Sequence, residues 1–162
     1  MSSKEPTIDE IKKRYEYILD PVTNIYTACA IFFMLYRNFI EKFEEYQFDD
    51  NIKKIRKGID DKGDKIDKNL LQSYGELLKE ISEDCEKIKE KVHSYYEEKS
   101  IILIEITVDY KENRNKPGTK EIYIKIGKDL IDEGVNIFIK YEKQLLLYND
   151  KINEIKKKIF NN

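Results

Sequence analysis

Residues 70–95 read LLQSYGELLKEISEDCEKIKEKVHSY, and this stretch decides the fold class of the chain. Its apolar residues recur at spacings of three and four, which approaches the heptad repeat of a helix packed along one narrow seam. The series consists of Leu70, Tyr74, Leu77, Ile81, Cys85, Ile88, Val92 and Tyr95. We therefore predict a long, coiled-coil-like amphipathic helix that begins near Asn69.

The C-terminal residues repeat the pattern. From about Gly134 onward the apolar series is Val135, Phe138, Tyr141, Leu145, Tyr148, Ile152, Ile155 and Ile159. Two long helices with matching seams pack most simply against each other, either within one chain or between two copies. The residues predicted to form this helix–helix interface are Tyr74, Ile81, Ile88 and Tyr95 on the first helix, and Tyr141, Leu145, Tyr148 and Ile152 on the second.

Between the two long helices the apolar period changes from helical to two. One face of the first extended segment is formed by Ile102, Ile104, Ile106, Val108 and Tyr110, and one face of the second by Ile122, Ile124 and Ile126. Strands alternate their side chains in this way, and residues 111–119 between the segments are rich in turn formers. The pattern predicts a β-hairpin over residues 101–126, with a continued helix as the alternative.

The N-terminal part predicts two further helices. Residues 7–10, Thr-Ile-Asp-Glu, form a capping box, and Asp20-Pro21 is typical of one helix ending and another beginning. The second helix, over Pro21–Tyr46, is apolar nearly all round at its centre, which indicates a buried position. Residues 49–68 alternate acid and base and predict a short helix followed by an exposed linker.

Together these elements predict a mainly α fold. We expect a helical bundle of four to five amphipathic helices, two of them long and coiled-coil-like, with one β-hairpin between the last two long helices. The segments 7–48, 49–68 and 69–160 are expected to form one cooperative domain, because 162 residues suffice for a single core.

Composition narrows the range of functions. The chain has 30 basic and 32 acidic residues, so its overall charge is close to neutral and does not favour general capture of nucleic acid. Neither a signal peptide nor an apolar run of about 20 residues is present, which predicts a cytoplasmic protein that does not act at a membrane. Cys29 and Cys85 lack the spacing of a zinc site or a disulfide framework and are read as buried thiols.

Catalysis is not expected. The chain has one histidine, His93, in a single Glu90-to-His93 ExxH spacing, and no nucleotide-binding or nucleophile motif accompanies it. We predict no enzymatic activity, no cofactor and no metal.

The turn between the expected strands carries the most distinctive polar cluster. Basic residues beside aromatic rings are suited to contact phosphates and stack on bases, although lysines also keep a loop soluble and protect a sheet edge. The candidate contact residues for nucleic acid or a partner are Lys111, Arg114, Lys116 and Lys120, flanked by Tyr110 and Tyr123.

The order of helix, hairpin and helix over Asn69–Ile159 resembles the subunits of prefoldin chaperones. The segment Glu121-Ile122-Tyr123-Ile124-Lys125-Ile126-Gly127, followed by a long helix, is similar to a strand, glycine and second helix of that family. The resemblance implies a coiled-coil arm and a hairpin that assembles with other copies. It covers little more than half of the chain, and the apolar N-terminal helix pair has no counterpart in that pattern.

The sequence therefore favours a non-enzymatic interaction or scaffold protein that acts through helix–helix contacts within a larger assembly. The expected partner is another protein or a second copy of the chain. The alternatives are a nucleic-acid-associated subunit that uses the basic turn, and a prefoldin-like chaperone.

Overall fold

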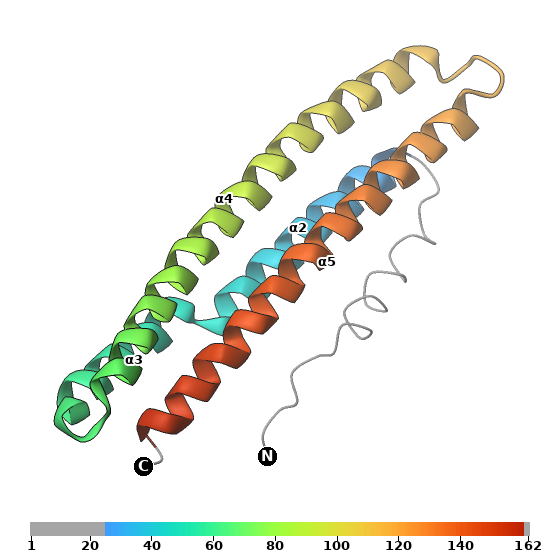
Figure 1. Ribbon diagram of the computed structural model, residues 1–162. Helices are drawn as coiled ribbons and strands as arrows, with labels where there is room; N and C mark the ends of the chain where they lie inside the picture. The colour runs from blue at the N-terminus through green and yellow to red at the C-terminus, as the bar shows by residue number, and fades with distance from the viewer. Residues whose placement is uncertain (1–24, 161–162) are drawn as a thin grey trace. The chain divides into compact units, whose positions relative to one another are not determined.

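The computed structural model describes residues 25–160, and these residues are almost entirely helical (Figure 1). The elements in chain order are α2 (Ile25–Tyr46), α3 (Phe48–Lys62), the 3-10 helix η1 (Gly63–Lys65), α4 (Lys68–Asn113) and α5 (Thr119–Phe160). The prediction of a mainly α, bundle-like fold is confirmed. None of the helices in this range is both long and apolar enough to cross a membrane.

The predicted β-hairpin is wrong, because residues 101–113 continue α4 and residues 119–126 begin α5. Alternating isoleucines satisfy a helix as well as a strand: Leu103 is buried, and Ile106 and Tyr110, three and seven positions later, are half-buried. The Thr107 hydroxyl donates to the Leu103 carbonyl oxygen at 2.7 Å, which accommodates this β-branched residue in a helix. Packing thus overrides the strand propensity of the segment.

The expected arrangement of four to five helices around a hairpin is not supported either. Each predicted strand is part of a long helix, and the predicted helix at residues 7–18 lies outside the described residues. The predicted turn is present, but it joins two helices: residues 114–118 connect α4 to α5, and Gly118 has φ +77°, a conformation that suits glycine.

The chain groups into two compact units. Among the described residues, unit 1 comprises residues 25–39 together with Val92–Glu142, and unit 2 comprises Ile40–Lys91 together with residues 143–160. Helices α2, α4 and α5 each contribute to both units. The single cooperative domain expected from the sequence stays a prediction.

Unit 1 has an aromatic core. Phe32, Phe39 and Phe138 are fully buried, and the Phe39 and Phe138 rings stack with centroids 5.8 Å apart. A glycine allows α5 to approach α2 closely, since a Cβ atom added at Gly127 would lie 2.8 Å from the Ala28 Cβ atom. This unit therefore combines bulky rings with very close helix packing at a glycine.

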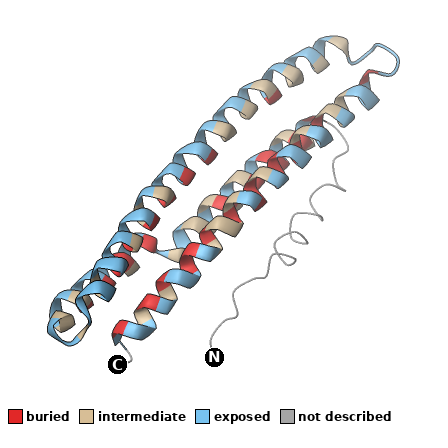
Figure 2. Ribbon diagram, viewed as in Figure 1, coloured by how far each residue is buried: buried red, intermediate tan, exposed pale blue. Residues whose placement is uncertain are grey.

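Unit 2 has a mainly aliphatic core, with its buried positions recurring along one side of each helix segment (Figure 2). The buried residues are Phe48, Ile52 and Ile55 of α3, Tyr74, Leu78, Ile81, Cys85 and Ile88 of α4, and Leu145, Tyr148, Ile152, Ile155 and Ile159 of α5. Burial at spacings of three and four on both long helices follows the seams read from the sequence, except that Leu78 is buried where Leu77 was expected and Leu70 is 41% exposed.

Candidate interaction surface

The residues predicted to form a helix–helix interface lie inside the chain's own units. In unit 2 the buried members are Tyr74, Ile81, Ile88, Leu145, Tyr148 and Ile152. In unit 1, Tyr95 and Tyr141 are half-buried. These seams are covered by neighbouring helix segments of the same chain, so an interaction surface has to be sought elsewhere.

Two seam tyrosines make polar contacts that anchor them. The Tyr148 hydroxyl donates to the Asp84 carboxylate, and burial together with this hydrogen bond raises the pKa of Tyr148 to about 12. The Tyr95 hydroxyl donates to Glu133 at 3.2 Å, and burial, followed by the Glu133 charge, raises the pKa of Tyr95. Both phenols therefore stay protonated near neutral pH and act as structural donors.

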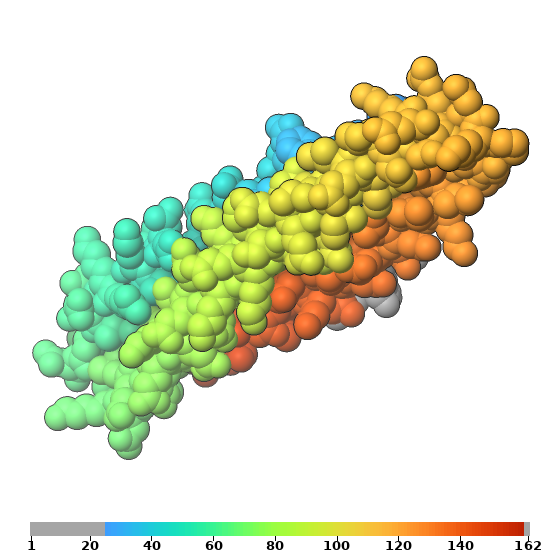
Figure 3. Space-filling model, turned by 90° about the horizontal axis from the view of Figure 1, so that it is seen from above, coloured from blue at the N-terminus to red at the C-terminus, as the bar shows by residue number. Residues whose placement is uncertain are grey.

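The predicted basic turn is exposed, but its tyrosines are engaged with other residues. Lys111, Arg114, Lys116 and Lys120 are all exposed around the α4–α5 turn. Tyr110 and Tyr123 are half-buried with ring centroids 5.3 Å apart, and the Tyr123 hydroxyl donates to Asp109, a bond that raises the pKa of Tyr123. The end of α4 and the start of α5 lie against each other in Figure 3, in yellow and orange. The rings therefore hold the turn together.

A second apolar stripe runs along α4 in unit 1, and the sequence reasoning missed it. Ile101, Ile104 and Val108 are 58%, 62% and 51% exposed, although their side chains are large and aliphatic. Their spacings of three and four place them on one side of the helix. The hairpin interpretation assigned Ile104 and Val108 to a strand face, so the helical spacing that begins at Ile101 went unrecognised.

The stripe ends in opposite charges. Glu97 lies four residues before Ile101, and Lys111 lies three residues after Val108; both are exposed. We call the five positions Glu97, Ile101, Ile104, Val108 and Lys111 the outer stripe. From Glu97 to Lys111 it spans 15 residues, and the 14 steps between them correspond to about 21 Å of helix.

Helix α2 flanks the outer stripe with aromatic residues. The Tyr26 ring lies 6.0 Å from the Tyr110 ring, and the Phe33 ring lies 6.4 Å from the Tyr96 ring. Tyr26 and Phe33 are nevertheless about half exposed. The Lys111 Nζ atom lies 6.0 Å from the Tyr26 ring centroid, so the basic end of the stripe is next to α2.

A hydrogen-bonded chain lies at the acidic end. The His93 Nε2 atom is 3.0 Å from the Glu97 Oε1 atom, and the His93 Nδ1 atom is 2.8 Å from the Tyr36 hydroxyl. A carboxylate only accepts, so Nε2 carries a proton; in the neutral imidazole, Nδ1 then accepts from Tyr36. Burial raises the pKa of Tyr36, which keeps it a donor.

The hydrogen bonds from Tyr36 through His93 to Glu97 have the connectivity of a nucleophile, base and orienting carboxylate. They differ from such a catalytic arrangement in their exposure to solvent. The His93 and Glu97 side chains are 54% and 63% exposed, so water screens them, whereas catalytic groups are activated in desolvated sites. Within residues 25–160, no group of three or more His, Cys, Asp or Glu side chains is placed to hold a metal ion. Positioning Glu97 at the end of the outer stripe is the role that this geometry supports.

Comparison of the chain with protein-family models, with curated proteins and with solved structures finds no match. The functional proposal therefore rests on the outer stripe and its surroundings.

Proposed function

We propose that this protein is a non-enzymatic helical assembly protein whose copies associate through the outer stripe of α4. The observation that carries the proposal is the line of three exposed aliphatic side chains, Ile101, Ile104 and Val108, on one side of α4. Contiguous apolar surface of this kind marks interaction sites, because covering it removes apolar area from water.

The order of residues along the outer stripe favours a second copy as the partner. Glu97 lies seven residues before Ile104, and Lys111 lies seven residues after it. If two α4 helices pack antiparallel about a twofold axis near Ile104, Glu97 of each copy faces Lys111 of the other. A parallel pair would instead place like charges together. The stripe is therefore self-complementary in the way that an isologous dimer requires.

The flanking residues support the same arrangement. Tyr26 and Phe33 widen the apolar surface beside the stripe, and aromatic residues are enriched at the centres of interfaces. The seam itself covers only two heptads, so we expect a reversible dimer that dissociates on dilution.

Light scattering coupled to size-exclusion chromatography over a range of concentrations tests the proposal. Ile104→Lys should abolish association, because it places a charge at the centre of the apolar seam. The matched control is Ile122→Lys, since Ile122 is 58% exposed in the same unit but belongs to α5 and not to the stripe. A wild-type chain that stays monomeric at every concentration would refute the proposal.

Charge reversal tests the antiparallel geometry separately from the apolar contact. Glu97→Lys and Lys111→Glu should each weaken association, because each single change places like charges opposite each other. The double variant should recover it, since the pair is restored with its sign exchanged. If the double variant associates no better than the single variants, the antiparallel register is wrong.

The basic turn supports a second candidate function, contact with nucleic acid, through its four exposed cationic side chains. Asp109, Glu112 and Glu121 stand among them and offset most of this charge. Binding that falls steeply with salt, and that a variant reversing Lys111, Arg114, Lys116 and Lys120 loses, would support this function. Salt-independent or absent binding would exclude it. The prefoldin-like alternative loses its support, because the segments expected to form its hairpin are helical.

A further inference from the structure

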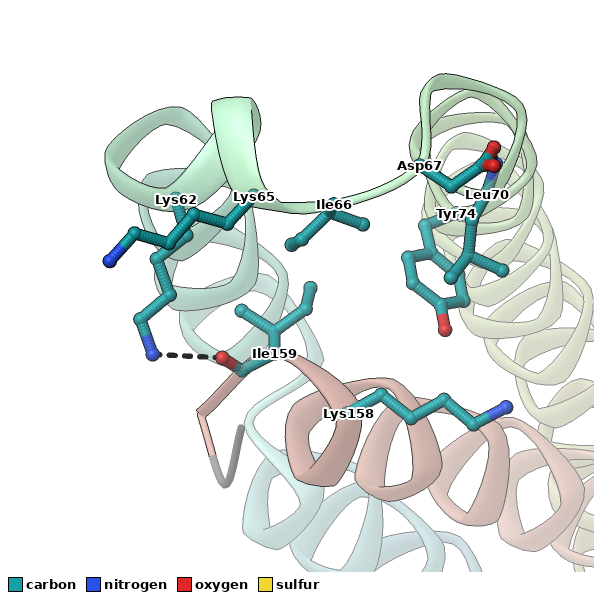
Figure 4. A pocket seen from close by; sticks show the side chains of 8 residues that line it. All are labelled: Lys62, Lys65, Ile66, Asp67, Leu70, Tyr74, Lys158 and Ile159. Atoms are coloured by element: carbon teal, nitrogen blue, oxygen red, sulfur yellow. Dashed lines mark hydrogen bonds between the residues drawn. The ribbon is translucent and has the colours of Figure 1, made fainter.

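A cavity of about 240 Å³ lies within unit 2, between η1 and the loop after it, the first turns of α4 and the end of α5 (Figure 4). Its aliphatic lining comes from Ile66, Leu70 and Ile159. It therefore suits a small molecule.

Tyr74 provides a polar group for such a molecule. Its side chain lines the cavity and is only 7% exposed, yet its hydroxyl has no hydrogen-bond partner among residues 25–160. Figure 4 shows this hydroxyl pointing toward the stem of Lys158 at the edge of the cavity. A buried hydroxyl without a partner is unfavourable, so a ligand that binds it gains a hydrogen bond that the fold does not supply.

The charges around the cavity favour an anion. Lys62, Lys65 and Lys158 line it, against the single carboxylate of Asp67. That carboxylate is already engaged at the start of α4, where Asp67 accepts from the amides of Asn69 at 2.8 Å and Leu70 at 3.3 Å. Even with Glu154, which lies 3.8 Å from Lys158, counted beside Asp67, the three lysines leave an excess of positive charge, and an anion is attracted to it.

The three lysines differ in how they are engaged. Lys62 donates to the Ile159 carbonyl oxygen at 2.9 Å at the end of α5, and Lys158 lies 3.8 Å from Glu154, one turn earlier on its own exposed helix face. In Figure 4 the Tyr74 side chain points toward Lys158 rather than toward Lys62 or Lys65. These two groups together mark where an anionic head would sit.

We propose that this cavity binds a small amphipathic carboxylate, with its carboxylate at the Tyr74 hydroxyl and Lys158 and its short apolar chain against Ile66, Leu70 and Ile159. This site is independent of the outer stripe, which lies in unit 1.

Calorimetric titration of the full chain tests the site with hexanoate, which has about the size of the cavity. We expect saturable binding of one hexanoate per chain, in the millimolar range that suits so small a ligand. Acetate lacks the apolar chain and hexylamine carries the opposite charge, so both should bind at least about tenfold more weakly. Equal binding of hexylamine, or no saturable binding of hexanoate, would overturn the proposal.

Variants assign the contacts. Tyr74→Phe removes only the hydroxyl and should weaken hexanoate binding about tenfold or more, because a hydrogen bond to a charged group is lost. Lys158→Gln should also weaken binding. The matched control is Lys157→Gln, which removes the neighbouring charge outside the cavity lining. If the two glutamine variants bind alike, the assignment of Lys158 fails.

The ligand-free Tyr74→Phe variant provides an independent check. Because the hydroxyl has no partner in the fold, its removal should leave the thermal unfolding midpoint unchanged or raise it. A marked fall would show that the hydroxyl serves the fold itself, and would contradict its role as a ligand-binding group.

Discussion

The two halves of α4 have apolar residues at the same helical spacing, but in one half most of these residues are covered and in the other several of them are exposed. In unit 2, residues 68–91 bury one seam, and exposed charged residues such as Lys79, Glu83 and Lys87 separate its members. In unit 1, residues 92–113 have an inner side that contacts α2 and α5, and also the apolar outer stripe. A helix segment with all its partners inside the chain is charged outward, whereas a second apolar side indicates a partner still to be bound.

The two units also differ in the composition of their cores and in how many large apolar side chains they expose. Unit 2 is filled mainly by aliphatic side chains from three helices, and its exposed large apolar residues are Leu70, Leu147 and Phe160. Unit 1 relies on Phe32, Phe39 and Phe138 and exposes more apolar side chains, including Met34 and Ile122. Surface and core therefore both mark unit 1 as the more aromatic and less completely covered region.

The largest effect is expected from the core of unit 1. Phe138→Ala should lower the free energy of unfolding by about 3–5 kcal/mol, because it removes a fully buried ring and leaves a cavity among Phe32, Phe39 and Tyr95. Phe33→Ala, at a ring that is 50% exposed, should cost less than about 1 kcal/mol. Urea unfolding of the two variants measures the difference, and similar losses would remove the distinction between core and surface rings.

Glycine-to-alanine substitutions should change stability by an intermediate amount, with opposite sign in the two units. Gly127→Ala gains up to about 1 kcal/mol of helix propensity, but its Cβ atom would meet the Ala28 Cβ atom at 2.8 Å, and overpacking costs about 1–3 kcal/mol. We expect a net loss, since the Ala28 methyl group cannot turn away.

Gly75→Ala in unit 2 is the matched control for this change. An added Cβ atom there meets nothing within 4 Å, so stability should rise by about 0.5–1 kcal/mol. Thermal unfolding of both variants provides the measurement. A stabilised Gly127→Ala variant would mean that α2 and α5 adjust freely in unit 1.

A smaller, pH-dependent effect is expected in unit 2. The pKa of Tyr148 rises from 10.0 to about 12 on folding, so the folded state holds this proton more tightly. The associated stability is fully present below pH 10 and is lost as the pH rises toward 12. Urea unfolding at several alkaline pH values should show this decline, and Tyr148→Phe should make it shallower. An unchanged slope in the variant would assign the decline to other groups.

The rates at which the two cysteines react with a thiol reagent compare the packing of the two units. Cys85 in unit 2 is buried, and burial, together with the nearby Asp84, raises the pKa of its thiol to about 12. Cys29 in unit 1 is half-buried. Because the thiolate is the reactive form, a thiol reagent near pH 8 should label Cys29 first. Faster labelling of Cys85 would show that unit 2 opens more readily than its packing indicates.

The long seams could be predicted from the sequence because each repeats many times. Ile81, Ile88, Leu145 and Ile152 are buried, as their spacing indicates. The same reasoning predicted a β-hairpin over residues 101–126, because a run of isoleucines fits a period of two and a period of 3.6 alike. Only contact with α2 and α5 decides between strand and helix there. The unpartnered hydroxyl of Tyr74 depends on residues far apart in the chain and leaves no local signal.

The ring contacts of Tyr110 close two chain loops of very different length. Its contact with Tyr123 spans 13 residues and its contact with Tyr26 spans 84. Loop-closure entropy grows with the logarithm of length, so closing the longer loop costs about 1.7 kcal/mol more. The α4–α5 turn should therefore form early in folding and α2 should dock onto it late. Pulse-labelled hydrogen exchange during refolding would then show protection around residues 105–125 before residues 25–39.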